Sequence, residues 1–144
     1  MSEWFDKLGT ISIGCQSYGP EDPYGDLKVG LWKRMVAEMP DISIGPIRHF
    51  AIALRVGAQF KDFDNYVITH VRAMSKIGYI GCDIEIPISE YTGKSDLQLR
   101  RRLVEMIGDS VNAMIVSLRK KKYEGNYERV LDSLEHVCND WVDE

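Results

Sequence analysis

The sequence has no long apolar run: no stretch approaches the roughly 20 consecutive residues that a membrane-spanning helix needs. Its start, Met1–Asp6, lacks the basic residues and the apolar segment of a signal peptide. We therefore expect a cytoplasmic protein with no membrane partner. The 144 residues are 44% hydrophobic and 28% charged, which is usual for a globular protein, and this length predicts one domain over residues 1–144.

Cysteine is scarce, with only Cys15, Cys82 and Cys138. An odd number of widely spaced cysteines argues against a disulfide framework, and the lack of a Cys-x-x-Cys pair argues against a structural zinc site. We expect three reduced, mostly buried thiols. The Gly-rich phosphate-binding motifs and the Gly-x-Ser-x-Gly motif of serine hydrolases are also lacking. No catalytic motif therefore stands out, and we expect no cofactor and no bound metal.

Regular hydrophobic periodicity is what the sequence does contain. Apolar residues at every second position predict strands, and apolar residues three to four apart predict helices. We predict strands at 11–18, 47–56 and 79–88, and helices at 27–39, 95–122 and 127–142. Asp26 and Asn126 are expected to cap the first and the last helix. Ser95 and Gln98 have the spacing of a capping box.

Residues 61–77 fit two patterns. Val67, Val71 and Met74 have helical spacing, whereas residues 66–71 are rich in strand-forming side chains. We favour a helix here and leave a strand as the open alternative.

Together these elements predict an α+β fold with a small sheet of three or more strands, helices packed on one face and a C-terminal helical hairpin. Pro87 cannot donate a backbone hydrogen bond, so we expect the strand at 79–88 to end at a sheet edge. The core stripe of the long helix is predicted to be Leu103, Ile107, Val111, Met114 and Leu118.

Charge is divided unevenly between the last two predicted helices. Residues 94–122 carry eight basic and three acidic side chains, whereas residues 123–144 carry one basic and seven acidic side chains. The two helices either neutralise each other across the hairpin or present charge to a partner. The basic residues 100–102 and 119–122 have no interleaved aromatic residues, so we do not expect nucleic acid to be that partner.

On the last helix, three carboxylates are predicted to face away from the core. Glu128, Asp132 and Glu135 lie opposite the apolar stripe, which consists of Val130, Leu134, Val137 and Trp141. We therefore predict that these three residues bind a basic partner. The sequence leaves the oligomeric state open.

Asp83 and Glu85 form a second acidic pair, on one side of the strand at 79–88. We regard them as a second candidate patch for the same partner. Two carboxylates at this spacing are also able to hold a divalent cation, which gives an alternative function as a metal-dependent nuclease or phosphodiesterase.

The arrangement of residues 78–144 resembles a known family. The run Gly78–Pro87 is followed by Tyr91, by a long helix from Ser95 to Lys122 and by an acidic final helix. This arrangement resembles the small immunity proteins of bacterial polymorphic-toxin and contact-dependent inhibition systems. The resemblance implies a non-enzymatic protein that binds one cognate toxin domain and blocks its active site. A nuclease toxin is expected to be basic, because it approaches a polyanionic substrate.

Overall fold

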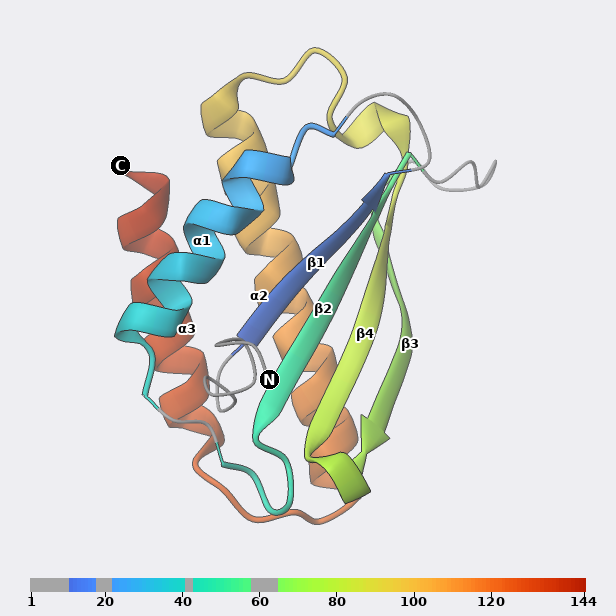
Figure 1. The fold of residues 1–144 in the computed structure, drawn as a ribbon, viewed down its shortest axis with the longest axis vertical. Coiled ribbons are helices and arrows are strands. Elements are labelled where there is room, and N and C mark those ends of the chain that lie inside the picture. The colour runs from blue at the N-terminus through green and yellow to red at the C-terminus, as the bar shows by residue number, and fades with distance from the viewer. Residues whose placement is uncertain (1–10, 18–21, 41–42, 58–64) are drawn as a thin grey trace.

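The computed structural model describes residues 11–17, 22–40, 43–57 and 65–144 (Figure 1). The strands are β1 (Ile11–Ser17), β2 (His49–Val56), β3 (Val67–Met74) and β4 (Tyr79–Ile86). The α-helices are α1 (Gly25–Glu38), α2 (Asp96–Lys120) and α3 (Tyr127–Val142), and the short 3-10 helices are η2 (Ser75–Ile77) and η3 (Ile88–Glu90). The predicted strands at 11–18, 47–56 and 79–88 and the three predicted helices are all present, with ends shifted by at most two residues. None of the described helices is long and apolar enough to cross a membrane.

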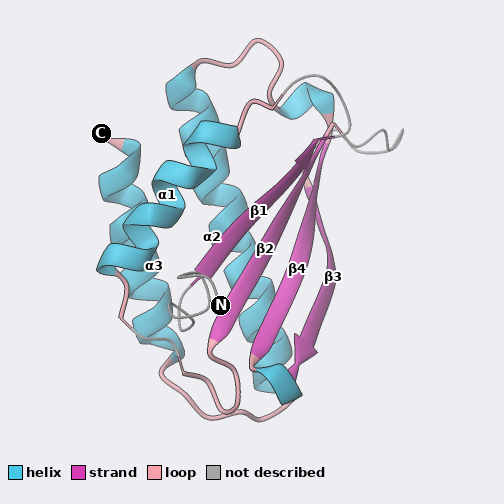
Figure 2. Cartoon of the chain, in the orientation of Figure 1, coloured by secondary structure: helices cyan, strands magenta, loops and turns pink. Residues whose placement is uncertain are grey.

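The four strands form one mixed sheet in the order β1-β2-β4-β3. β1, β2 and β4 run parallel to one another, and β3 pairs antiparallel with β4 at one edge. Helix α2 crosses one face of the sheet, while α1 lies beside β1 and contacts α3 (Figures 1 and 2). The opposite face of β2 and β4 is covered by no described helix. The predicted α+β fold, with helices on one face and a C-terminal helical hairpin, is confirmed.

The hydrophobic core lies between the sheet and the helices. Alternate residues of β2 and β4 are buried toward α2, as expected for strands with one covered face. The predicted stripe of α2 completes this core, because Leu103, Ile107, Val111, Met114 and Leu118 are all fully buried. The predicted stripe of α3 is buried as well, at Val130, Leu134, Val137 and Trp141. The apolar faces of both helices therefore follow from the sequence.

Side chains cap α2 and α3 as predicted. The Ser95 hydroxyl accepts a hydrogen bond from the Gln98 backbone N–H, and the Gln98 side chain accepts one from the Ser95 N–H, which completes the capping box. Asn126 accepts a hydrogen bond from the Arg129 backbone N–H at the start of α3. The predicted cap of the first helix is wrong: α1 begins at Gly25, so Asp26 lies inside its first turn. A carboxylate at this position still stabilises the helix, because it lies near the positive end of the helix dipole.

The helix that we favoured for residues 61–77 is wrong. Residues 67–74 form β3, and residues 75–77 form the 3-10 helix η2, while residues 61–64 lie outside the described part of the chain. Pairing with β4 decides the conformation, because a short helix with a narrow apolar stripe is only marginally stable, whereas strand-forming residues gain side-chain packing in the sheet. Val71 and Met74, two members of that helical stripe, are exposed.

The sheet-edge position expected from Pro87 is also wrong. β4 lies between β2 and β3, so it is an inner strand. It ends at Ile86, and Pro87 follows as the residue that precedes η3. Because Pro87 is outside the ladder, its missing N–H costs the sheet no hydrogen bond.

Candidate functional site

The outer face of α3 carries three carboxylates that make no ion pair with any described residue. Glu128, Asp132 and Glu135 are exposed, and they lie opposite the buried stripe of the same helix. We call these three residues the acidic surface. The α3 carboxylates that do form ion pairs lie nearer its C-terminal end, where Asp140 contacts Arg34 and His136. The acidic surface therefore holds three carboxylates that no described cation binds in an ion pair.

Three arginines of the neighbouring helix α2 are engaged in other contacts. The Arg102 guanidinium binds both carboxylate oxygens of Glu90 at 2.6 to 2.9 Å. Arg100 binds Asp96, donates a hydrogen bond to the Trp141 backbone carbonyl and stacks 4.8 Å from the centroid of the Trp141 ring. Arg119 lies 4.4 Å from the centroid of the Tyr127 ring.

These contacts decide between the two interpretations of the charge pattern. Among the described residues, no ion pair joins a cation of α2 to a carboxylate of α3; the two helices meet through apolar contacts and through arginines stacked on aromatic rings. Among these residues, the basic side chains of α2 therefore do not neutralise the carboxylates of α3 through ion pairs. The same contacts occupy three arginines that a nucleic-acid surface would need.

A shallow groove of about 360 Å³ runs between α2 and α3 beside the acidic surface. Glu135 lines this groove and so joins it to the acidic surface. The remaining lining residues are Val104, Glu105, Gly108, Asn112, Leu131, Leu134, Cys138 and Asn139. Two carboxylates, two amides and an apolar floor are suited to a long basic side chain, because the methylene stem packs on the apolar part and the charged end reaches a carboxylate.

The second predicted patch belongs to a cluster on the open face of the sheet. The Asp83 carboxylate lies 3.2 Å from Nδ1 of His70 and 3.4 Å from a guanidinium nitrogen of Arg55, which also lies 3.7 Å from Glu85. Parallel pairing places Ala53 beside Asp83 and Arg55 beside Glu85, which explains why the arginine reaches both carboxylates. Neither His70 nor Arg55 was among the predicted site residues.

His70 reaches Asp83 because β3 is irregular at this point. The register between β3 and β4 shifts between Thr69 and Arg72, and His70 has a φ of 55°. Such a bulge bends the strand and redirects a side chain, and a left-handed conformation is costly for a residue other than glycine. A pattern of strand-forming residues does not predict where a bulge falls, so the sequence did not place His70 beside Asp83.

Asp83 and Glu85 point off the apolar side of β4, as predicted, but they differ in exposure. The Asp83 side chain is 26% exposed, whereas that of Glu85 is 6% exposed. Glu85 therefore offers little surface to a protein partner. The cluster of His70, Asp83 and Glu85 has the ligand types that a divalent cation uses, with ligand atoms within 4.8 Å of one another. The guanidinium of Arg55 already lies within ion-pair distance of both carboxylates, so a cation would have to displace it.

Cysteine chemistry is not favoured at any of the three thiols. Burial raises the pKa of Cys82 to about 11 and that of Cys138 to about 12. Burial and the neighbouring Asp22 carboxylate raise the pKa of Cys15 to about 11. Because the thiolate is the nucleophile, these thiols are poor nucleophiles near pH 7. None of the three forms a disulfide, and Cys82 and Cys138 are buried, so the predicted burial of most of the cysteines is confirmed.

His49 gives the fold a predicted pH dependence. Its side chain is buried, its Nε2 lies 2.8 Å from the Ser12 hydroxyl, and burial lowers its pKa from 6.5 to about 4. As the pH falls, the His49 imidazole is therefore protonated in the unfolded chain before it is protonated in the folded protein. The stabilising contribution is complete above about pH 6.5 and is lost as the pH falls toward 4, by up to about 3 kcal/mol.

Urea unfolding of the wild-type chain and of His49→Gln between pH 7 and pH 4.5 measures this contribution. We expect a smaller decrease in unfolding free energy with acidification for the variant. An identical pH dependence for the two proteins would contradict the assignment to His49.

The described residues thus offer two candidate sites of different chemistry. The acidic surface of α3 suits a basic macromolecule, and the cluster around Asp83 suits a cation or a small polar ligand. Comparison with known proteins finds no matching family model, no similar curated protein and no similar solved structure.

Proposed function

We propose that the protein is a non-enzymatic immunity protein that binds a basic toxin domain through the acidic surface of α3. The observation that carries the proposal is the unpaired state of Glu128, Asp132 and Glu135, which form no ion pair with a described residue although a basic helix lies next to them. Unbalanced charge of one sign on an exposed helix face attracts a partner of the opposite sign.

The physical chemistry of inhibition supports this choice of partner. A toxin that cleaves nucleic acid needs a basic active-site region, and an acidic protein that covers this region competes with the substrate for the same cations. The groove between α2 and α3 adds a place for one side chain of the partner next to Glu135. Charge then speeds the encounter, and the groove provides a contact that depends on shape.

Co-expression tests the proposal. The probe is the protein encoded by the gene next to this one, expressed in cells with and without this chain. We expect that protein to arrest growth, and we expect this chain to restore growth and to co-purify with it. A non-toxic neighbour, or a toxic one that neither binds this chain nor is neutralised by it, would contradict the proposed function.

One observation favours a second candidate function, a metal-dependent nuclease or phosphodiesterase. His70 adds a third ligand, an imidazole, to Asp83 and Glu85, the two carboxylates on which that alternative rests. In this function, a divalent cation held by these three residues would activate water for attack on a phosphodiester.

Hydrolysis assays separate the two functions. The purified chain is incubated with Mg²⁺ or Mn²⁺ and with RNA, DNA or cyclic nucleotides, alongside Asp83→Ala. If the second function holds, we expect metal-dependent cleavage that falls by a factor of at least about 100 in the variant. Metal-dependent cleavage that survives in Asp83→Ala would exclude this site as its source.

A further inference from the structure

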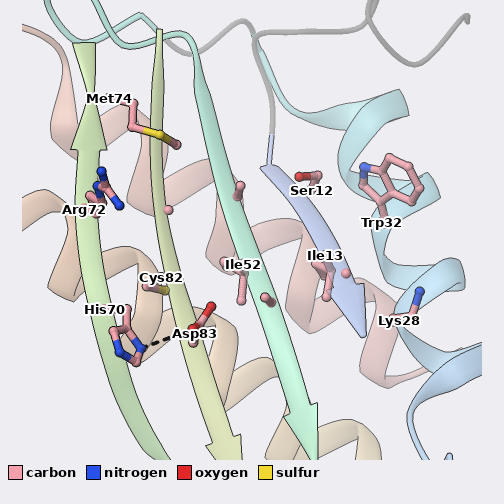
Figure 3. Close-up of a pocket in the computed structure, with 14 residues that line it drawn as sticks. Ser12, Ile13, Lys28, Trp32, Ile52, His70, Arg72, Met74, Cys82 and Asp83 are labelled. Atoms are coloured by element: carbon pink, nitrogen blue, oxygen red, sulfur yellow. Dashed lines mark ion pairs between the residues drawn. The ribbon is translucent and has the colours of Figure 1, made fainter. Parts of the chain in front are cut away.

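A pocket of about 570 Å³ lies on the open face of the sheet (Figure 3). Its floor is made of small residues from three adjacent strands: Gly14 of β1, Ala51 and Ala53 of β2, and Gly81 of β4. The strand register places these residues side by side, since Ala51 pairs with Gly81 and Ala53 pairs with Gly14. The result is a flat floor, bordered by α1 on one side and by β3 on the other.

The fold itself does not require glycine at Gly14 or Gly81. Neither residue has a positive φ. A Cβ added at Gly14 would come no closer than 4.0 Å to its nearest neighbour, the backbone oxygen of Ile52, and one added at Gly81 would lie 3.4 Å from the oxygen of Ala51. A larger residue would also favour a strand, whereas glycine in a strand often marks a place where a ligand approaches the backbone closely.

The walls of the pocket carry an aromatic ring and two cations. Trp32 and Lys28 project from α1, and Arg72 projects from β3 toward the floor (Figure 3). Neither Lys28 nor Arg72 forms an ion pair with a described residue. Asp83, which also lines the pocket, is already paired with His70 and Arg55. The charge that remains available to a ligand is therefore positive.

We propose that this pocket binds a small planar anion of the mononucleotide class. The flat floor and the Trp32 side chain suit a planar ring, because such a ring stacks on flat surfaces and aromatic groups. Lys28 and Arg72 suit the phosphate, which accepts charge-assisted hydrogen bonds. The volume lies within the range of roughly 300–1,000 Å³ that is common for small-molecule sites.

This inference does not rest on the proposed immunity function. The ligand is expected to bind the chain without a partner, in a pocket that no residue of the acidic surface lines. Binding also requires no hydrolysis. Failure of one proposal therefore leaves the other standing.

The test is a titration of the purified full-length chain, without any partner, with AMP, GMP, CMP and UMP at low salt. Calorimetry measures the affinity, and amide chemical shifts in nuclear magnetic resonance spectra locate the site. We expect at least one of the four to saturate, with shifts at Gly14 and Gly81. We expect the matching nucleoside and inorganic phosphate alone to bind at least about tenfold more weakly, because each lacks half of the contacts. Failure of all four to saturate would overturn the inference.

Two variants test the position of the ligand. Gly14→Val fills the floor and should abolish binding, and its Cβ would lie no closer than 4.0 Å to a neighbouring atom. Gly108→Ala, on a helical glycine outside the pocket with no atom within 4 Å of the added Cβ, should not change binding. Arg72→Gln should weaken binding about tenfold through the lost charge, and Arg101→Gln on the exposed face of α2 is its control. If Gly14→Val does not fold, Arg72→Gln decides: nucleotide affinity unchanged in either folded variant would overturn the inference.

Discussion

Replacing Ile107 with Asp is expected to remove most of the stability of the protein. Ile107 is fully buried in the middle of α2, where the core stripe meets the sheet. Burial of a carboxylate without a partner costs several kcal/mol, and a domain of this size is stable by only about 5–15 kcal/mol. Thermal and urea unfolding measure the loss.

Val116→Asp is the matched control for this prediction. Val116 lies on the same helix but is 52% exposed, so the same chemical change should alter the unfolding free energy by less than about 1 kcal/mol. A folded Ile107→Asp protein with a melting temperature close to that of Val116→Asp would show that the core stripe is assigned to the wrong face.

Replacing Arg102 with Met is also expected to lower the free energy of unfolding strongly. Arg102 holds the Glu90 carboxylate in a two-pronged contact, and Glu90 is buried. Removing one partner of a buried ion pair leaves the other charge uncompensated and costs about 3–5 kcal/mol. Arg101, its exposed neighbour, forms no ion pair with a described residue, so Arg101→Met should cost far less.

A double variant separates the pair from the rest of the Arg102 environment. Arg102 also contacts Glu105 and stacks over the Tyr66 ring, and both contacts are lost in Arg102→Met. Adding Glu90→Gln removes the uncompensated charge and should recover part of the lost unfolding free energy. If Arg102→Met unfolds no more easily than Arg101→Met, the Glu90 contact contributes nothing to stability.

Local patterns predicted most of the fold because most of its elements bury one face. α2 shows this best: its stripe and its capping box depend on residues within a few turns of one another, so the sequence alone identifies them. β3 shows the limit. Its conformation is decided by pairing with β4, a contact between residues such as Ile68 and Ile84 that no local spacing reveals.

The candidate sites were predictable to different degrees for the same reason. The exposure of Glu128, Asp132 and Glu135 follows from helical periodicity. That they form no ion pair with a described residue does not follow, since the arginines of α2 contact Glu90, the Trp141 ring or the Tyr127 ring through the tertiary structure.

The cluster around Asp83 could not be predicted from hydrophobic periodicity alone. Arg55 reaches it through the parallel register of β2 and β4, and His70 reaches it through a bulge in β3. Both are long-range features of the sheet. The pocket on the open face was missed because its floor consists of glycine and alanine, which carry no chemical signal in a sequence.

Reversal of the acidic surface tests the proposed function most directly. The association rate of the protein encoded by the neighbouring gene is measured with wild-type chain, with Glu128→Lys/Asp132→Lys/Glu135→Lys and with the control Asp26→Lys/Asp96→Lys, at low and at high salt. None of these changes touches the buried stripe of α3, so all three proteins should fold.

We predict that the triple variant associates at least about tenfold more slowly than wild type and control at low salt, and that the difference shrinks at high salt, because charges separated by more than about 10 Å are screened at roughly 0.1 M. Equal association rates of the triple variant and the control at low salt would contradict the proposal that the acidic surface of α3 binds the partner.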